Sequence, residues 1–154
     1  KISEIKKSVL GNEGRYGIIK NWVETVINLS STSNLATLIE NLLSCHDEGT
    51  RWAIAKLAKQ WVINLNNIER FKLLNILVND SHPWVLQQTM HELGQSSFQI
   101  TGENSRTLVN AAYNNIQTAA RLGWDEKELM IGFLQLLSKR PETLDSISLK
   151  NHNA

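Results

Sequence analysis

The sequence predicts an all-α fold, an α-solenoid of about four antiparallel helix pairs in a single repeat domain spanning residues 1–154. Two observations predict it. Apolar residues recur at steps of three and four along most of the chain, and no segment alternates with the period of a strand. Between residues 35 and 96 a helix–turn–helix pattern occurs twice, about 35 residues apart, as expected for stacked two-helix units. The repeated positions are Leu38, Ile39, Leu42 and Leu43 with Leu73, Leu74, Leu77 and Val78, and Ala53, Ile54, Leu57 and Ala58 with Thr89, Met90, Leu93 and Gly94.

The composition favours a folded domain and argues against a nucleic-acid or membrane-surface binder. Apolar residues make up 42% of the chain and charged residues 20%, which is typical of a folded domain. The net charge of +1 lacks the basic surplus of a nucleic-acid or membrane-surface binder. Cys45 is the single cysteine, so no internal disulfide forms, and a reducing compartment such as the cytoplasm is favoured. The first residue is Lys, which is expected for a segment of a larger protein or for a processed product, whereas the short, self-contained length favours a small dedicated partner protein.

Helix signals in the first half of the chain occur over residues 2–10, 19–27, 35–43 and 54–65. Three glycines predict a loop over residues 11–17. Ser33 or Asn34 is expected to cap the third helix with its side chain, and the acids of the turn at residues 46–49 suit the start of the fourth. Asn66 and Asn67 are expected to end that helix.

The second half begins with a helix around residues 71–78. Ser81 or His82 is expected to cap the next helix, with Pro83 at its first position. Residues 96–104 are predicted to be a loop. A third pair follows over residues 109–120 and 130–137, with Gly123 ending its first helix and Asp125 forming a capping box with Glu128. Residues 142–154 are expected to fray.

The two repeated units resemble HEAT-type repeats and, more loosely, armadillo-type repeats. Asp47 with Thr50-Arg51, and Asp80 with Pro83-Trp84-Val85, match the acidic turn and the small apolar or basic start of the second helix in that family. The resemblance covers residues 18–138. It implies that the second helices line a concave surface that binds a partner.

On these second helices, positions away from the apolar stripe are the candidate partner-binding residues. They are Trp52, Lys56, Lys59, Gln60, Trp84, Gln88, His91 and Gln95, continued by Glu128, Gln135 and Lys139 in the third pair. This mixed, polar surface suits a protein or peptide better than a phosphate backbone. The alternative is an ordinary solvated helix face. The function predicted is therefore a non-enzymatic protein–protein interaction module, either a scaffold segment or a small inhibitor or immunity-type protein.

The alternative function is that of a HEAT-like DNA-binding protein or DNA glycosylase. HEAT-like glycosylases hold the duplex in a basic groove, which Arg51, Trp52, Lys56 and Lys59 resemble. The second unit places Gln88, His91 and Glu92 at the related positions, and these are not cationic.

No catalytic, metal or cofactor site is predicted. His91-Glu92 lacks the second histidine of a zinc-protease helix, because residue 95 is Gln. Cys45 and His46 are adjacent and would point about 100° apart on a helix, so Cys45 is expected to be a buried structural residue. Trp22 and Trp61 lie on apolar stripes and are expected in the core. Trp52, Trp84 and Trp124 lie near helix starts, where they either anchor a partner or seal the junctions between units.

Overall fold

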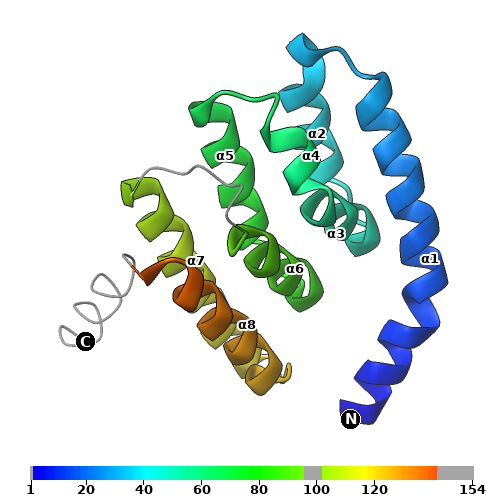
Figure 1. The fold of residues 1–154 in the computed structure, drawn as a ribbon. Helices are drawn as coiled ribbons and strands as arrows, with labels where there is room; N and C mark the ends of the chain where they lie inside the picture. Colours follow the sequence, from blue (N-terminus) through cyan, green and yellow to red (C-terminus); the bar gives the residue numbers. More distant parts are fainter. Residues whose placement is uncertain (1, 96–101, 142–154) are drawn as a thin grey trace.

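A computed structural model describes the backbone of residues 2–95 and 102–141, and the side chains from residue 14 onward within those ranges. All regular structure in these residues is helical, which confirms the predicted all-α class (Figure 1). The helices are α1 (Ile2–Leu29), α2 (Leu35–Leu43), α3 (Glu48–Lys56), α4 (Ala58–Val62), α5 (Asn67–Val78), α6 (Pro83–Leu93), α7 (Gly102–Arg121) and α8 (Glu126–Lys139), with a 3-10 turn η1 (Thr32–Asn34) before α2. None of the described helices is long and apolar enough to cross a bilayer.

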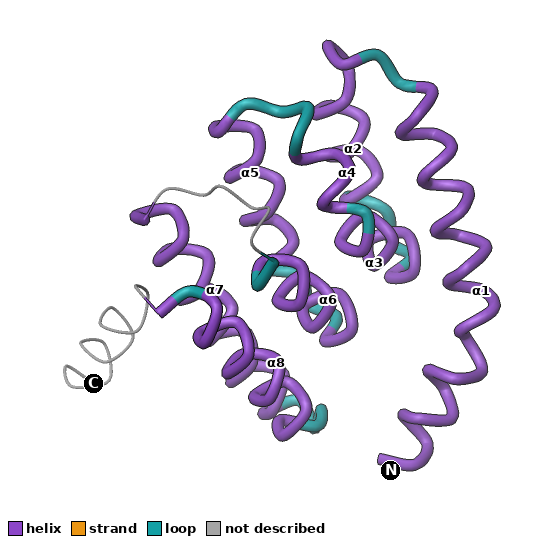
Figure 2. Tube along the Cα trace, viewed as in Figure 1, coloured by secondary structure: helices purple, strands orange, loops and turns teal. Residues whose placement is uncertain are grey.

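The helices form two rows. In one row α1 packs on α3, α3 on α6, and α6 on α8, and in the other α2 packs on α5 and α5 on α7 (Figures 1 and 2). Each of α2, α5 and α7 also contacts the helix that follows its turn. The described chain thus contains three helix hairpins beside one long helix. The predicted first pair is wrong, because residues 2–10 and 19–27 belong to the single helix α1.

The predicted loop at residues 11–17 is part of α1. Each glycine in a helix costs only about 1 kcal/mol, so packing of the helix overrides the local signal. Tyr16, Val23 and Ile27 are buried on one side of α1, which packs on α3. Gly49 lies at the start of α3 in the same contact, and the space at its Cα is filled by Ile19 and Tyr16.

Gly17 and Gly49 are expected to respond in opposite ways to alanine. A Cβ at Gly17 meets nothing within 4 Å, so Gly17→Ala should raise the free energy of unfolding by about 0.5–1 kcal/mol. A Cβ at Gly49 would stand 2.9 Å from Ile19 Cδ1 and 3.1 Å from Tyr16 Cε1, so Gly49→Ala should lower it. Urea unfolding of both variants measures the difference, and stabilisation by Gly49→Ala would contradict the close contact.

The helix starts confirm some predicted caps and correct others. His82 caps α6 through its side chain, with Pro83 at the first position, as predicted. Asn66, which was expected only to end the preceding helix, caps α5 in a reciprocal capping box with Glu69. Asp125 caps α8 by accepting from the Lys127 N–H, so it acts without the predicted partner Glu128. At α2 the predicted side-chain cap is wrong. The side chain of Asn34 makes no such bond, Ser33 lies inside the preceding 3-10 turn, and the Leu35 N–H donates to Thr32 O of that turn.

Both ends of α7 and the position of Cys45 can also be compared with the predictions. Gly123 has φ +91° just after α7, as a helix end requires, and Gly102–Asn104 belong to α7 rather than to the predicted loop. The rest of that predicted loop, residues 96–101, and the tail at residues 142–154 lie outside the described residues. Cys45 is exposed rather than buried, because it lies in the turn after α2.

The predicted helix over residues 54–65 is interrupted at Leu57, which separates α3 from α4. The indole N–H of Trp61 donates to the carbonyl of Ile54 at 2.9 Å. In an unbroken helix that carbonyl would accept from the amide of residue 58. Trp61 is fully buried as predicted, whereas Trp22 is 57% exposed on α1, so its prediction as a core residue is wrong.

Candidate functional site

The eight predicted partner-binding residues lie on neighbouring helices of one row. Four are on α3 and α4, three are on α6, and Gln95 follows α6 directly; α3 and α6 are in contact. Lys56, Lys59, Gln60, His91 and Gln95 are exposed, and Trp52, Trp84 and Gln88 are half-buried. We call this set the binding face (Trp52, Lys56, Lys59, Gln60, Trp84, Gln88, His91 and Gln95).

Two amide side chains of the binding face are held by carboxylates. The Gln60 amide donates to Glu24 Oε2 on α1 at 2.7 Å. The Gln88 amide donates to Glu92 Oε1 one helical turn further along α6 at 2.9 Å, and Glu92 is buried. These bonds fix the orientation of both amides and occupy the two carboxylates beside them.

At the N-terminal end of the binding face, aromatic rings form a continuous row across the helix starts. The Tyr16 ring on α1 lies 5.1 Å from the Trp52 ring and 5.9 Å from the Trp84 ring. The His82 ring lies 5.1 Å from Trp84 and 5.5 Å from Trp124. The rings thus join α1, α3, α6 and the start of α8. This position fits the expectation that the tryptophans seal junctions between units, while their half-buried edges stay accessible.

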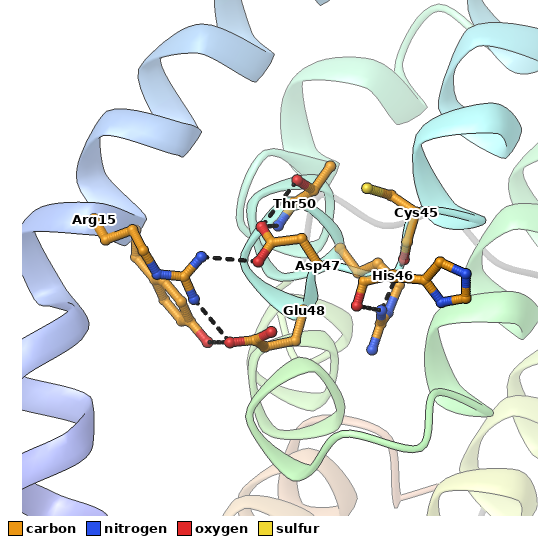
Figure 3. Close-up of polar contacts among 8 residues, drawn as sticks. Arg15, Cys45, His46, Asp47, Glu48 and Thr50 are labelled. Atoms are coloured by element: carbon orange, nitrogen blue, oxygen red, sulfur yellow. Dashed lines mark hydrogen bonds and ion pairs between the residues drawn. The ribbon is translucent and has the colours of Figure 1, made fainter.

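A polar cluster joins α1 to the start of α3 (Figure 3). Arg15 Nη1 lies 2.8 Å from Asp47 Oδ1, and Arg15 Nη2 lies 2.8 Å from Glu48 Oε1. Asp47 Oδ2 also accepts from the backbone N–H and the hydroxyl of Thr50, and Tyr16 donates its hydroxyl to Glu48 at 3.3 Å. One basic side chain therefore bridges two acids of the turn before α3.

The pKa values of this cluster follow from burial and charge. Burial raises the pKa of the Tyr16 hydroxyl, and the Glu48 carboxylate raises it further. For Asp47 burial alone would raise the pKa, but hydrogen bonds and charge from Arg15, with the bonds from Thr50, outweigh burial and lower it. Asp47 therefore stays ionised and serves as the cap of α3.

A second arginine joins the turn before α3 to the turn before α6. Arg51 Nε lies 2.7 Å from Asp80 Oδ2, Nη2 lies 3.2 Å from Asp80 Oδ1, and Nη1 donates to the carbonyls of Cys45 and His46. Asp80 Oδ1 in turn accepts from the His82 backbone N–H at 2.9 Å. Arg51 and Asp80 were predicted to lie at the repeat turns, but their pairing was not predicted, because it depends on the packing of α3 on α6.

The cap that His82 forms on α6 depends on the protonation state of its imidazole. Its Nδ1 accepts from the Trp84 backbone N–H at 3.2 Å, which requires an unprotonated nitrogen. Burial lowers the pKa of the imidazole, Arg51 also lowers it, and the carboxylates of Glu48 and Asp80 offset this only in part.

We expect the stability of the fold to fall in acid through His82. The unfolded chain protonates its histidine near pH 6.5, above the pKa in the folded state, so the contribution is full above that pH. It is lost as the pH falls from about 6.5 through the folded-state pKa. Asparagine can still cap the helix, so His82→Asn should flatten this slope in urea unfolding between pH 7 and pH 5. His91→Asn on the exposed part of α6 should keep the slope, and equal slopes in both variants would contradict the assignment.

The eight residues of the binding face remain a prediction from helical spacing, and Arg15 and Tyr16 were not among them, because residues 11–17 were predicted to be a loop. Their only signal was the basic–aromatic pair within the glycine-rich stretch. Among the described residues, no three His, Cys, Asp or Glu side chains gather as metal ligands would. Comparisons with protein-family models, with curated proteins and with solved structures find no match to this chain.

Proposed function

We propose that this chain is a short HEAT-like α-solenoid that binds a protein partner through the binding face. The observation that carries the proposal is that five exposed polar residues, the half-buried Gln88 and two half-buried tryptophans lie together on α3, α4, α6 and the residues just after α6. Half-buried tryptophans beside polar side chains are common anchors of protein interfaces. A partner could therefore pack on the aromatic edges and form hydrogen bonds along the helices.

The packing of the hairpins supports the solenoid part of the proposal. The repeated positions of the first helices, Ile39 and Leu43 in α2 and Leu74 and Val78 in α5, are buried in both units. Their helices contact each other, and so do the second helices α3 and α6. Each unit therefore buries its apolar side against the next one in the manner of a repeat array.

The chemistry of the binding face favours a protein over a nucleic acid. Amide side chains can donate to and accept from a peptide backbone, and the face carries Gln60, Gln88 and Gln95. A phosphate backbone is bound mainly by many closely placed cations, and this chain has a net charge of only +1. The DNA-binding alternative thus has less support and becomes an outcome of the test.

The test is co-purification with a variant that removes polar groups of the binding face without changing its lysines. Gln60→Ala, His91→Ala and Gln95→Ala are combined, and the matched control combines Asn41→Ala, Asn114→Ala and Gln117→Ala, which are exposed on the other row. We expect the unaltered chain and the control to retain a stoichiometric partner and the binding-face variant to lose it. Retention by all three, or salt-sensitive binding of duplex DNA in place of a protein, would overturn the proposal.

A further inference from the structure

Acidic residues are concentrated at the starts of α3 and α8. Asp47 and Glu48 at the start of α3 both pair with Arg15, whereas at the start of α8 Glu126 and Glu128 are exposed on either side of Lys127. Basic residues lie toward the C-terminal ends. We call Lys56, Lys59 and Lys139, with His91 between them, the cationic edge.

Contacts between the helices place the cationic edge on one side of the row. The starts of α3 and α6 are joined by the pair Arg51–Asp80, and the two helices pack on each other, so their C-terminal ends lie on the same side of the row. At the far end of α6, Lys139 Cγ lies 3.6 Å from where a Cβ on Gly94 would stand, and Arg140 Nε donates to the Leu93 carbonyl at 2.8 Å. The C-terminal ends of α6 and α8 are therefore neighbours, and Figure 1 shows these two helices side by side.

The lysines of the cationic edge form no ion pair within the described part of the chain, although other basic residues do. Arg15, Arg51, Lys72 and Arg106 each lie within 4.0 Å of a carboxylate. Near the cationic edge, the carboxylates of Glu24 and Glu92 already accept from Gln60 and Gln88. All three lysines are exposed. Their ammonium groups are thus available to carboxylates of another molecule.

We infer that the cationic edge binds an acidic segment of the partner, with the rest of the partner lying along the binding face toward Trp52 and Trp84. This inference rests on the proposed function and names the chemistry of the partner. Opposite charge across an interface fixes the orientation of the partner and speeds its encounter. Three exposed lysines on α3, α4 and α8 match a few spaced carboxylates. A nucleic-acid backbone would also meet the acids at the start of α8.

The probe is a fluorescent twelve-residue peptide in which six glutamates alternate with serine and glycine, and its control has glutamine at those six positions. We expect the full chain to bind the glutamate peptide at low salt, to lose it as salt increases, and to bind the glutamine peptide at least tenfold more weakly. Equal affinity for both peptides, or tighter binding of a 20-base-pair duplex than of the glutamate peptide, would overturn the inference.

Matched variants locate the contact. Lys56→Gln, Lys59→Gln and Lys139→Gln together should weaken binding of the glutamate peptide at least tenfold. Lys72→Gln, Arg121→Gln and Lys127→Gln remove the same charge from exposed positions elsewhere and should change it less than twofold. Equal weakening by both sets would contradict the cationic edge, and circular dichroism confirms that both variants fold.

The same triple lysine variant separates this inference from the proposed function. In the co-purification experiment it should lose the partner, as the variant of Gln60, His91 and Gln95 does. If the triple lysine variant keeps the partner while the variant of Gln60, His91 and Gln95 loses it, the inference of an acidic partner segment is wrong, and the proposal that the binding face binds a protein stands. If both variants keep the partner, both proposals fail.

Discussion

Trp61→Ala is expected to lower the free energy of unfolding by about 3–5 kcal/mol, the range for removing a buried aromatic side chain. Trp61 is fully buried and is the largest such side chain among the described residues. Its indole N–H donates to the Ile54 carbonyl at the junction of α3 and α4. The substitution therefore leaves a cavity and removes the donor from a buried carbonyl.

Two further variants divide this effect into its parts. Trp61→Phe keeps most of the ring volume and loses the hydrogen bond, so it should cost clearly less than Trp61→Ala. Trp22→Ala removes the same side chain where it is 57% exposed and should change stability by no more than about 1 kcal/mol. Urea unfolding at one pH compares all three, and equal losses at positions 22 and 61 would contradict the difference in burial.

These two tryptophans show where sequence periodicity stops being informative. Both lie at helical spacing with other apolar residues, so both were predicted to be in the core. On α1, however, apolar residues occur on two opposite sides: Val23 and Ile27 are buried, whereas Ile18, Trp22 and Leu29 are exposed. Spacing shows which residues share a side of a helix, but only the packing of other helices decides which side is buried.

The fold was more predictable than the site for a related physical reason. Caps such as His82 with Pro83 are local, because a side chain and a backbone N–H two or three residues away decide them, and they could be predicted from the sequence. The contact of Tyr16 with Trp52 and Trp84, and the bonds of Arg15 to Asp47 and Glu48, join residues 32 or more positions apart. No local pattern encodes them. The residues of the binding face could be proposed from the sequence because the proposal needs only helical spacing, and their role in binding stays a prediction.

Arg51→Gln is expected to destabilise the fold by about 3 kcal/mol, near the lower end of the range for breaking a buried ion pair. The Arg51 side chain is 15% exposed and that of Asp80 6% exposed, so neither is fully hydrated when its partner is lost. The substitution also removes the donor to the carbonyls of Cys45 and His46 in the turn before α3.

A double-mutant cycle with Asp80→Asn isolates the pair itself. If the two side chains act mainly on each other, the double variant should be less destabilised than the sum of the single variants by more than 1 kcal/mol. The exposed pair Lys72–Glu40, whose side chains are 59% and 46% exposed, provides the comparison, and its cycle should give less than about 1 kcal/mol. Simple additivity at Arg51 and Asp80 would mean that the two turns are held together by the helices alone. A large coupling would show that this ion pair fixes α3 against α6, and with them the two halves of the binding face.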